Sequence, residues 1–286
     1  MKNISAVLLC CSLFYSCANH GQLKFLSKLP SDLKENSGIA YYQGDSAWLV
    51  ADSGNHDIIY NISFNGEQLN KLKVKNAKNR DWEDLTEDKE GNLYIGDFGN
   101  NRNDRKDLTI YKLPNPDVEK GDKIDAEKIT FSYPEQKDFP AKKKDRLFDA
   151  EALFHYQGNL YIFTKNRANP FTGETRLYKV PDSKGDYEAQ FIAKLNICND
   201  WETCRITSAD ISDDGKTVVL LGYGKIWLFT GFGNDNFFDS TSKEIDLGVR
   251  TQLESVSFAS DNTLLISDEK SKAGGGNLYS FQLPSN

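Results

Sequence analysis

The chain has 286 residues, of which 38% are hydrophobic and 12% are aromatic, so it can bury a sizeable core. The net charge is −7, with 35 basic and 42 acidic residues interspersed along the sequence. This balance argues against a nucleic-acid partner, which requires a basic face. We expect a globular protein with a solvated, charged surface that functions as a monomer.

The N-terminus has the features of an export signal. A short basic start, Met1–Asn3, precedes a twelve-residue apolar stretch, Ile4–Tyr15, and the small residue Ser16 stands before Cys17. The stretch suits the core of a signal peptide and is too short to span a bilayer. We predict a lipoprotein signal peptide over residues 1–16, with Cys17 lipidated after cleavage; an ordinary signal peptide cut nearby is the alternative. The protein would then lie in the cell envelope, anchored by lipid to the outer membrane and facing the periplasm.

The rest of the chain repeats one pattern five times: strand, tight turn, strand, polar loop, strand. β-Branched and aromatic residues bounded by Gly, Asn and Asp are typical of β-hairpins. Repeats of such units, at a period of roughly 40–70 residues, indicate an all-β fold of the β-propeller class. The second strands of the five units are expected at Ala47–Ala51, Leu93–Gly96, Leu160–Phe163, Val218–Leu221 and Leu264–Ser267.

A fourth strand is expected in four of the units, at Leu69–Val74, Lys128–Tyr133, Gln190–Leu195 and Lys243–Leu247. The fifth unit ends without one, and Leu23–Ser27 could supply it. Pairing these ends of the chain would remove an exposed sheet edge. We therefore favour five blades in a single domain over residues 17–286. Six blades would need one hidden in Asn115–Phe148, whose Lys-, Asp- and Pro-rich composition indicates a long connection instead.

Four arginines each precede an acidic residue by three to five positions, just before a first strand. A closed ring would bring these copies together, because the strands that line the channel begin at the same face. Residues that end the second strands would meet there too. The acids, which we predict as metal ligands, are Glu83, Glu151, Asp210 and Glu254. The predicted ligand-binding residues are Arg80, Arg146, Arg205, Arg250, Lys165, Asp52, Asp97 and Asp268.

Carboxylates that converge on one axis repel one another unless a cation, protons or arginines compensate them. Oxygen ligands without a His or Cys cluster suit a hard ion, with Ca²⁺ as the first choice and Mg²⁺ as the second. The alternative is structural: the four arginines pair with the acids and lock the ring. A mixed ring could also hold an anionic ligand on its arginines.

Two cysteines, Cys198 and Cys204, remain in the mature chain besides Cys17. In an exported protein this spacing favours a disulfide that closes a short loop, and a CxxC spacing for a metal or redox site is absent. Two free thiols are the alternative.

The segment Gly38–Leu72, with Ala51-Asp52-Ser53-Gly54-Asn55-His56, resembles an NHL-type propeller repeat. The mature chain is similar in layout to bacterial propeller lipoproteins of the SdiA-regulated and phytase-like esterase groups. More distantly it resembles the gluconolactonase and strictosidine-synthase propellers. The gluconolactonase-like propellers hold a divalent ion at the channel mouth, and the resemblance implies Glu83, Glu151 and Glu254 as the matching acids. The Asn ligands of that group have no clear match in this sequence.

Two functions follow from these features. The first is a lipoprotein that binds a small or anionic ligand, or serves as a scaffold, through the charged ring. The second is a metal-dependent hydrolase acting on a lactone, ester or phosphoester, with a carboxylate as base. A fold of this kind serves many functions, so the site must decide between them.

Overall fold

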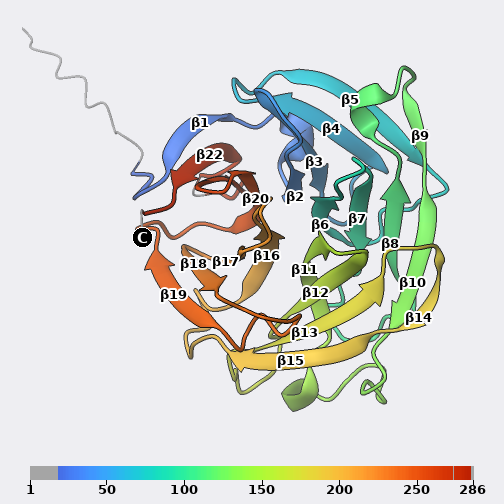
Figure 1. The fold of residues 1–286 in the computed structure, drawn as a ribbon, viewed down its shortest axis with the longest axis vertical. Coiled ribbons are helices and arrows are strands. Elements are labelled where there is room, and N and C mark those ends of the chain that lie inside the picture. The colour runs from blue at the N-terminus through green and yellow to red at the C-terminus, as the bar shows by residue number, and fades with distance from the viewer. Residues whose placement is uncertain (1–18, 273, 285–286) are drawn as a thin grey trace, which may run out of the picture.

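The computed structural model describes residues 19–272 and 274–284. The expected signal peptide and Cys17 lie outside these residues. Figure 1, viewed along the central axis, shows five antiparallel blades arranged in a ring, with β2, β6, β11, β16 and β20 innermost. The prediction of a five-bladed β-propeller is confirmed.

Each blade is built from consecutive strands, and we number the blades in chain order. Blade 1 contains β2 (Asn36–Ala40), β3 (Ser46–Ala51), β4 (Ile58–Ser63) and β5 (Gln68–Lys75). Blade 2 contains β6 (Trp82–Glu87), β7 (Leu93–Asp97), β8 (Leu108–Leu113) and β10 (Glu127–Ser132). Blade 3 contains β11 (Asp149–Tyr156), β12 (Asn159–Lys165), β13 (Glu174–Pro181) and β15 (Gln190–Asn196). Blade 4 contains β16 (Ile206–Ile211), β17 (Thr217–Gly222), β18 (Lys225–Thr230) and β19 (Thr241–Asp246).

Blade 5 joins the two ends of the chain. It contains β20 (Leu253–Ser260), β21 (Thr263–Asp268) and β22 (Asn277–Gln282), and its outer strand is β1 (Lys24–Lys28). β1 runs antiparallel to β22, with Lys24 opposite Ser280 and Lys28 opposite Asn277. The N-terminal strand therefore covers the edge of the last blade, which would otherwise expose a row of unpaired backbone groups.

Two short strands that the sequence analysis missed tie neighbouring blades together. β9 (Lys123–Asp125) leaves blade 2 and runs parallel to β5 of blade 1. β14 (Gly185–Glu188) leaves blade 3 and runs parallel to β10 of blade 2. Both are only a few residues long and mostly exposed, so their sequences carry little of the alternating pattern that identifies a strand.

The hydrophobic core lies between the blades. Trp48 of blade 1 and Trp82 of blade 2 belong to one buried cluster, and similar clusters fill the other four interfaces. Both indoles are at most 1% exposed, and truncating a buried side chain of this size typically costs about 3–5 kcal/mol. Because each blade packs its apolar side chains against both neighbours, the first strands are held in a fixed ring around the axis.

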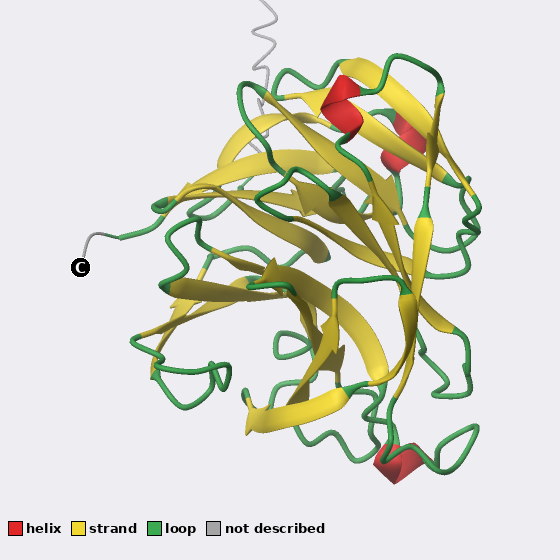
Figure 2. Ribbon diagram, turned by 45° about the vertical axis from the view of Figure 1, so that its right-hand side comes forward, coloured by secondary structure: helices red, strands yellow, loops and turns green. Residues whose placement is uncertain are grey.

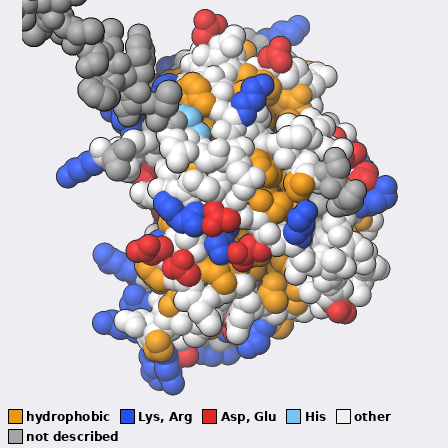
Figure 3. All heavy atoms as spheres, turned by 90° about the vertical axis from the view of Figure 1, so that its left-hand side faces the viewer, with side chains coloured by type: hydrophobic (Ala, Val, Ile, Leu, Met, Phe, Trp, Pro, Cys, Tyr) orange, Lys and Arg blue, Asp and Glu red, His pale blue; other side chains and the backbone are white. Residues whose placement is uncertain are grey.

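Helical structure in residues 19–272 and 274–284 is limited to three short 3₁₀ turns, η1 (Ser31–Leu33), η2 (Pro116–Val118) and η3 (Lys143–Asp145), drawn red in Figure 2. None of the described helices is long and apolar enough to cross a membrane. On the face shown in Figure 3, acidic and basic side chains lie side by side, as the mixed charge of the sequence predicts.

Candidate functional site

A β-bulge at the start of every first strand positions the site. The pairing with the second strand shifts by one residue at the same place in all five blades. Such a bulge inserts one extra residue and redirects its side chain. The extra residues of blades 1 to 5 are, in order, Ser37, Glu83, Glu151, Thr207 and Glu254.

The bulge residues fall into two groups. Ser37 Oγ donates to the carbonyl of Trp82 (2.8 Å), and Thr207 Oγ1 donates to the carbonyl of Leu253 (2.7 Å), so each hydroxyl links its blade to the next. Glu83, Glu151 and Glu254 carry carboxylates and line, together with Ser37, a cavity of about 1050 Å³. We call this end of the channel the bulge-side mouth.

One part of the bulge-side mouth is a closed network of charges. Glu151 accepts from Lys165 Nζ (2.9 Å) and from Arg167 Nη2 (2.9 Å), while Arg167 Nε donates to Asp149 (2.5 Å). The side chains of Glu151 and Lys165 are each 4% exposed. Although burial acts to raise it, the pKa of Glu151 is lowered because Lys165 and Arg167 favour the charged form.

Tyr223, just after β17, joins this network to Glu254. Its hydroxyl donates to Glu254 Oε1 (2.8 Å), and Lys165 Nζ lies 5.4 Å from the centre of its ring. Burial raises the pKa of Glu254, and Lys165 opposes the shift. Tyr223 therefore connects Glu254 to the charged network through a hydrogen bond on one side and a cation–ring contact on the other.

A second part of the mouth contains acids that form no ion pair with any of the described residues. Single carboxylate oxygens of Asp52, Asp81 and Glu83 all lie within 4.8 Å of one another. Glu83 is only 6% exposed, and its carboxylate takes part in none of the hydrogen bonds or ion pairs found among the described residues. Burial raises its pKa well above the usual range, and the charges of Glu151, Asp52 and Asp81 raise it further.

The neighbouring acids respond in the same way. Burial raises the pKa of Asp52 to about 7 and that of Asp81 to about 6, and nearby carboxylates add to both shifts. Gly99 allows the close approach: a Cβ placed there would lie 2.0 Å from Glu83 Oε1 and 2.4 Å from Asp81 Oδ2. We call Asp52, Asp81 and Glu83 the acidic triad.

The prediction that four acids converge at one mouth of the channel is wrong for Asp210. It lies at the other end of the channel, in a cavity of about 1100 Å³ that we call the turn-side mouth. There its Oδ2 accepts from the backbone N–H of Phe258 (2.7 Å), and its pKa is raised to about 7 by burial. The reason is register: Thr207 takes the bulge position in blade 4, and Asp210 is three residues further along the strand.

The two mouths are separated by Asp84, which follows the bulge in blade 2. Its carboxylate, fully buried, accepts from Ser208 Oγ of blade 4 (3.0 and 3.1 Å) and from the backbone N–H of Leu153 in blade 3 (3.1 Å). The hydrogen bonds of Asp84 therefore connect blade 2 with blades 3 and 4 across the axis, in the middle of the channel. The turn-side mouth has its own cluster of Asp88, His155 and Asp182, in which His155 Nε2 lies 2.9 Å from Asp182 Oδ2.

The arginines that open the repeats do not pair with the acids that follow them. Arg80 pairs with Asp107 on the surface, and Arg250 pairs with Asp246 (2.8 Å). Arg146 points its Nε toward the carbonyl of Ala141 (3.5 Å). The alternative in which these arginines lock the ring by pairing with the acids is therefore not what the structure shows. Of the predicted acids, Glu151 is bound by Lys165 and Arg167, from the end of a second strand.

The predicted ligand-binding residues also fall into two groups, those that line the bulge-side mouth and those that lie elsewhere. Arg205, Arg250, Lys165, Asp52 and Asp268 line the bulge-side mouth, whereas Arg80, Arg146 and Asp97 do not. Asp97 is held by Arg105 (3.2 Å). Asp268 accepts from Thr251 Oγ1, Tyr279 and Asn277, so its oxygens are already bonded.

Sequence reasoning missed Asp81, Asp149 and Arg167 as parts of the site. Asp81 directly follows Arg80, and Arg167 stands two residues after Lys165. A sequence signal was thus present, since each lies next to a residue already selected. It could not be interpreted because the sequence does not show that Arg167 reaches Asp149 and Glu151 across the β11–β12 hairpin, or that Asp81 of blade 2 lies beside Asp52 of blade 1. The predicted disulfide between Cys198 and Cys204 is confirmed, with 5.6 Å between the Cα atoms.

Comparison with known proteins supports the fold alone. The sequence matches no family model and no curated protein. The PQQ-bound aldose sugar dehydrogenase from Streptomyces coelicolor is similar in structure, with a TM-score of 0.54 and 11% identity over 92% of this chain and 98% of that one. A gluconolactonase from Xanthomonas campestris has a TM-score of 0.46 and 12% identity, over 87% of this chain and 72% of that one. The likeness to the dehydrogenase shows a shared propeller architecture and no more.

Proposed function

We propose that the bulge-side mouth binds a divalent cation through the acidic triad, and that this ion holds a small, oxygen-rich molecule in the cavity. The observation that carries the proposal is Glu83, a carboxylate 6% exposed that faces the cavity and has no bonding partner within residues 19–272 and 274–284. A buried charge is stable only when it is paired, protonated or bound to a metal. Lys165 and Arg167 cannot serve Glu83, because they are bound to Glu151 and Asp149.

The choice of ion follows from the donor atoms. The triad offers carboxylate oxygens alone, which suit Ca²⁺ first and Mg²⁺ second. Three carboxylates from two blades leave the side of the ion toward the cavity for oxygens of a ligand. Gly99 keeps the space around Glu83 and Asp81 open, because any side chain at this position would occupy it.

Hydrolysis of a lactone, ester or phosphoester is the second candidate function. The observation that favours it is Glu254, which lines the same cavity, is bonded to Tyr223 and has a raised pKa. A carboxyl group with a raised pKa can act as a general base or acid near neutral pH. A bound divalent ion would supply charge stabilisation for the developing oxyanion. Glu254→Gln separates the two candidates, because it would abolish hydrolysis and leave cation binding nearly intact.

Calorimetry tests the cation site directly. The protein, freed of metal with EDTA and then dialysed, is titrated with CaCl₂ and separately with MgCl₂. We expect saturable binding that Glu83→Gln removes, while Glu87→Gln, which changes an acid at the turn-side mouth, leaves it unchanged. Failure of the parent protein to bind either ion would refute the proposal.

We also propose that the protein is exported and held at the membrane by lipid on Cys17, facing the periplasm. The support is the sequence of residues 1–17, which combines a basic start, an apolar core and a small residue before the cysteine. The disulfide agrees with an oxidising compartment.

A further inference from the structure

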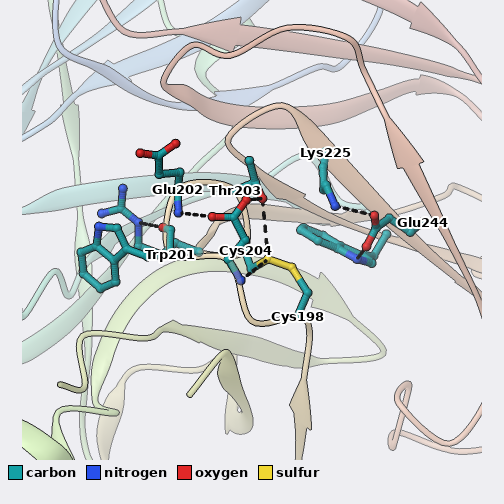
Figure 4. The surroundings of a disulfide bond; sticks show 10 residues. Cys198, Trp201, Glu202, Thr203, Cys204, Lys225 and Glu244 are labelled. Atoms are coloured by element: carbon teal, nitrogen blue, oxygen red, sulfur yellow. Dashed lines mark hydrogen bonds and ion pairs between the residues drawn. A yellow bond between two sulfur atoms is a disulfide. The ribbon is translucent and has the colours of Figure 1, made fainter. Parts of the chain in front are cut away.

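A short loop closed by the disulfide forms part of the rim of the bulge-side mouth. Within the loop, Asp200 accepts from Thr203 Oγ1 (2.7 Å) and from the backbone N–H of Glu202 (2.9 Å), so the turn between Cys198 and Cys204 is compact. Figure 4 shows the loop, with Trp201 turned to one side and the sulfur bridge at its base. The loop therefore holds Trp201 in a defined place beside the cavity.

Arg205, which follows the disulfide cysteine Cys204, contacts two aromatic rings. Its Cζ atom lies 4.4 Å from the ring centre of Trp201 and 4.8 Å from that of Tyr223. Its Nε donates to the carbonyl of Trp201 (2.9 Å). Stacking and this hydrogen bond fix the plane of the guanidinium group, so its outer N–H groups are preorganised for a ligand.

Arg205 differs from the other arginines that line this cavity, because those arginines form ion pairs with carboxylates. Arg167 binds Asp149 and Glu151, and Arg250 binds Asp246. Among the described residues, no carboxylate forms an ion pair with Arg205, although it lines the cavity and is only partly exposed. Its two outer nitrogens also make no hydrogen bond within the part of the chain that the structure describes.

We infer that Arg205 binds an acidic group of the ligand, so that the ligand class is a small molecule carrying a carboxylate or phosphate. A planar guanidinium binds such oxyanions through two parallel hydrogen bonds. Tyr223 places this subsite next to the rest of the site, because its ring contacts Arg205 and its hydroxyl binds Glu254. The inference rests on the proposed function in that the same cavity holds the ligand, and the acidic triad would bind its other oxygens through the ion.

The test uses three probes that differ in one group: glycerol, glycerate and glycerol 3-phosphate. The full-length protein is titrated with each probe, both metal-free and with Ca²⁺. Intrinsic fluorescence gives a second readout, because Trp201 is 43% exposed while Trp48, Trp82 and Trp227 are at most 4% exposed. We expect glycerate or glycerol 3-phosphate to bind and to change the fluorescence of Trp201, whereas glycerol does not bind.

Substitutions then assign the binding to Arg205. Arg205→Met should weaken binding of the acidic probe by about tenfold or more, as expected for the loss of a charge-assisted hydrogen bond. Arg205→Lys should recover only part of it, since a lysine cannot present the planar fork. Arg250→Met is the matched control, because Arg250 lines the same cavity but is neutralised by Asp246. Thermal melting checks that each variant is folded.

The outcomes separate this inference from the cation site. Equal binding of glycerol and its acidic counterparts, no binding of either acidic probe, or unchanged binding in Arg205→Met would each overturn the inference. Acidic probes that bind the metal-free protein through Arg205 would support it even if Ca²⁺ does not bind. Conversely, Ca²⁺ binding with no effect of Arg205→Met would leave the cation site intact and remove the anion subsite.

Discussion

Lys165, the last residue of β12, binds the bulge residue Glu151 of the adjacent strand β11, with 2.9 Å between Nζ and Oε2. Both side chains are 4% exposed. Both charges are almost completely shielded from water, so Lys165 depends on Glu151, and Glu151 depends on Lys165 and Arg167. This pair is therefore structural, unlike the acidic triad beside it.

Glu151→Gln should mainly reduce stability. The substitution leaves the Lys165 cation buried without its partner, and removing one partner of a buried pair costs about 3–5 kcal/mol. Urea unfolding measures this free energy. Glu254→Gln is the comparison, because Glu254 forms no ion pair with the described residues and its direct contact is the hydrogen bond to Tyr223, for which we expect about 1 kcal/mol. A Glu151→Gln protein that is fully stable but no longer binds Ca²⁺ would show that Glu151 is a metal ligand instead.

The metal-free protein should become less stable as the pH rises from about 4 to about 7. The pKa values of Asp52 (about 7), Asp81 (about 6) and Glu83 are raised in the folded state. Between the unfolded and folded pKa values the folded state binds more protons, so the free energy of unfolding falls with rising pH. Urea midpoints in EDTA at pH 5, 6, 7 and 8 measure the slope.

Two changes should flatten this slope. Saturating Ca²⁺ compensates the carboxylates, so stability should depend less on pH and Ca²⁺ affinity should rise between pH 5 and 8 as protons leave. Glu83→Gln removes one acid and should have a similar, smaller effect in EDTA. A slope of the opposite sign in the parent protein would show that the triad is already compensated.

Gly99→Ala should abolish cation binding without unfolding the protein. The added Cβ would lie 2.0 Å from Glu83 Oε1, so the carboxylate must move away from its neighbours. Gly233→Ala is the control, because a Cβ there meets nothing within 4 Å. Calorimetry with Ca²⁺ and thermal melting are compared for both variants. Normal Ca²⁺ affinity in Gly99→Ala would mean that Glu83 does not contribute to the ion site.

Loss of the disulfide should reduce both the stability of the protein and its affinity for the acidic probe, and the effect on the affinity should be the larger one. The double substitution Cys198→Ser, Cys204→Ser opens a short loop, so the free energy of unfolding should drop by about 2 kcal/mol, the lower end of the usual range. Binding of the acidic probe should weaken as well, since Trp201 would no longer hold Arg205 in place. Urea unfolding and calorimetry give the two values. Unchanged probe affinity would show that the loop does not organise Arg205.

Cys17→Ser should release the protein from membranes while leaving it folded. Membrane attachment is expected to come from the lipid, and none of the described helices is long and apolar enough to span a bilayer. Fractionation of cells that express the parent protein and the variant, followed by detection in the membrane and soluble fractions, measures the effect. A variant that still sediments fully with the membranes would refute the lipid anchor.

The sequence alone predicts the ring, because alternation of apolar residues and turn signals are local properties that repeat five times. It also predicts the closing strand, since the fifth unit lacks its outer strand and only the N-terminal segment is left to supply it. Glu83, Glu151 and Glu254 follow from the same repeat. Each lies at the start of a first strand, and the strands share one direction around the axis.

What the sequence could not provide is register and pairing across blades. Asp210 stands the same distance after its arginine as Glu151 does, yet it lies at the opposite mouth, because the bulge of blade 4 falls on Thr207. Which acid each basic side chain binds also depends on the tertiary structure. Lys165 and Arg167 reach Glu151 and Asp149 from the end of the neighbouring strand. Within the part of the chain that the structure describes, neither Glu83 nor Arg205 is left with an ion-pair partner. The contacts of Lys165 and Arg167 depend on which side chains the β11–β12 hairpin places within reach of one another. The acidic triad, by contrast, needs Asp52 of blade 1 beside Asp81 and Glu83 of blade 2, and only the folded ring brings these segments together.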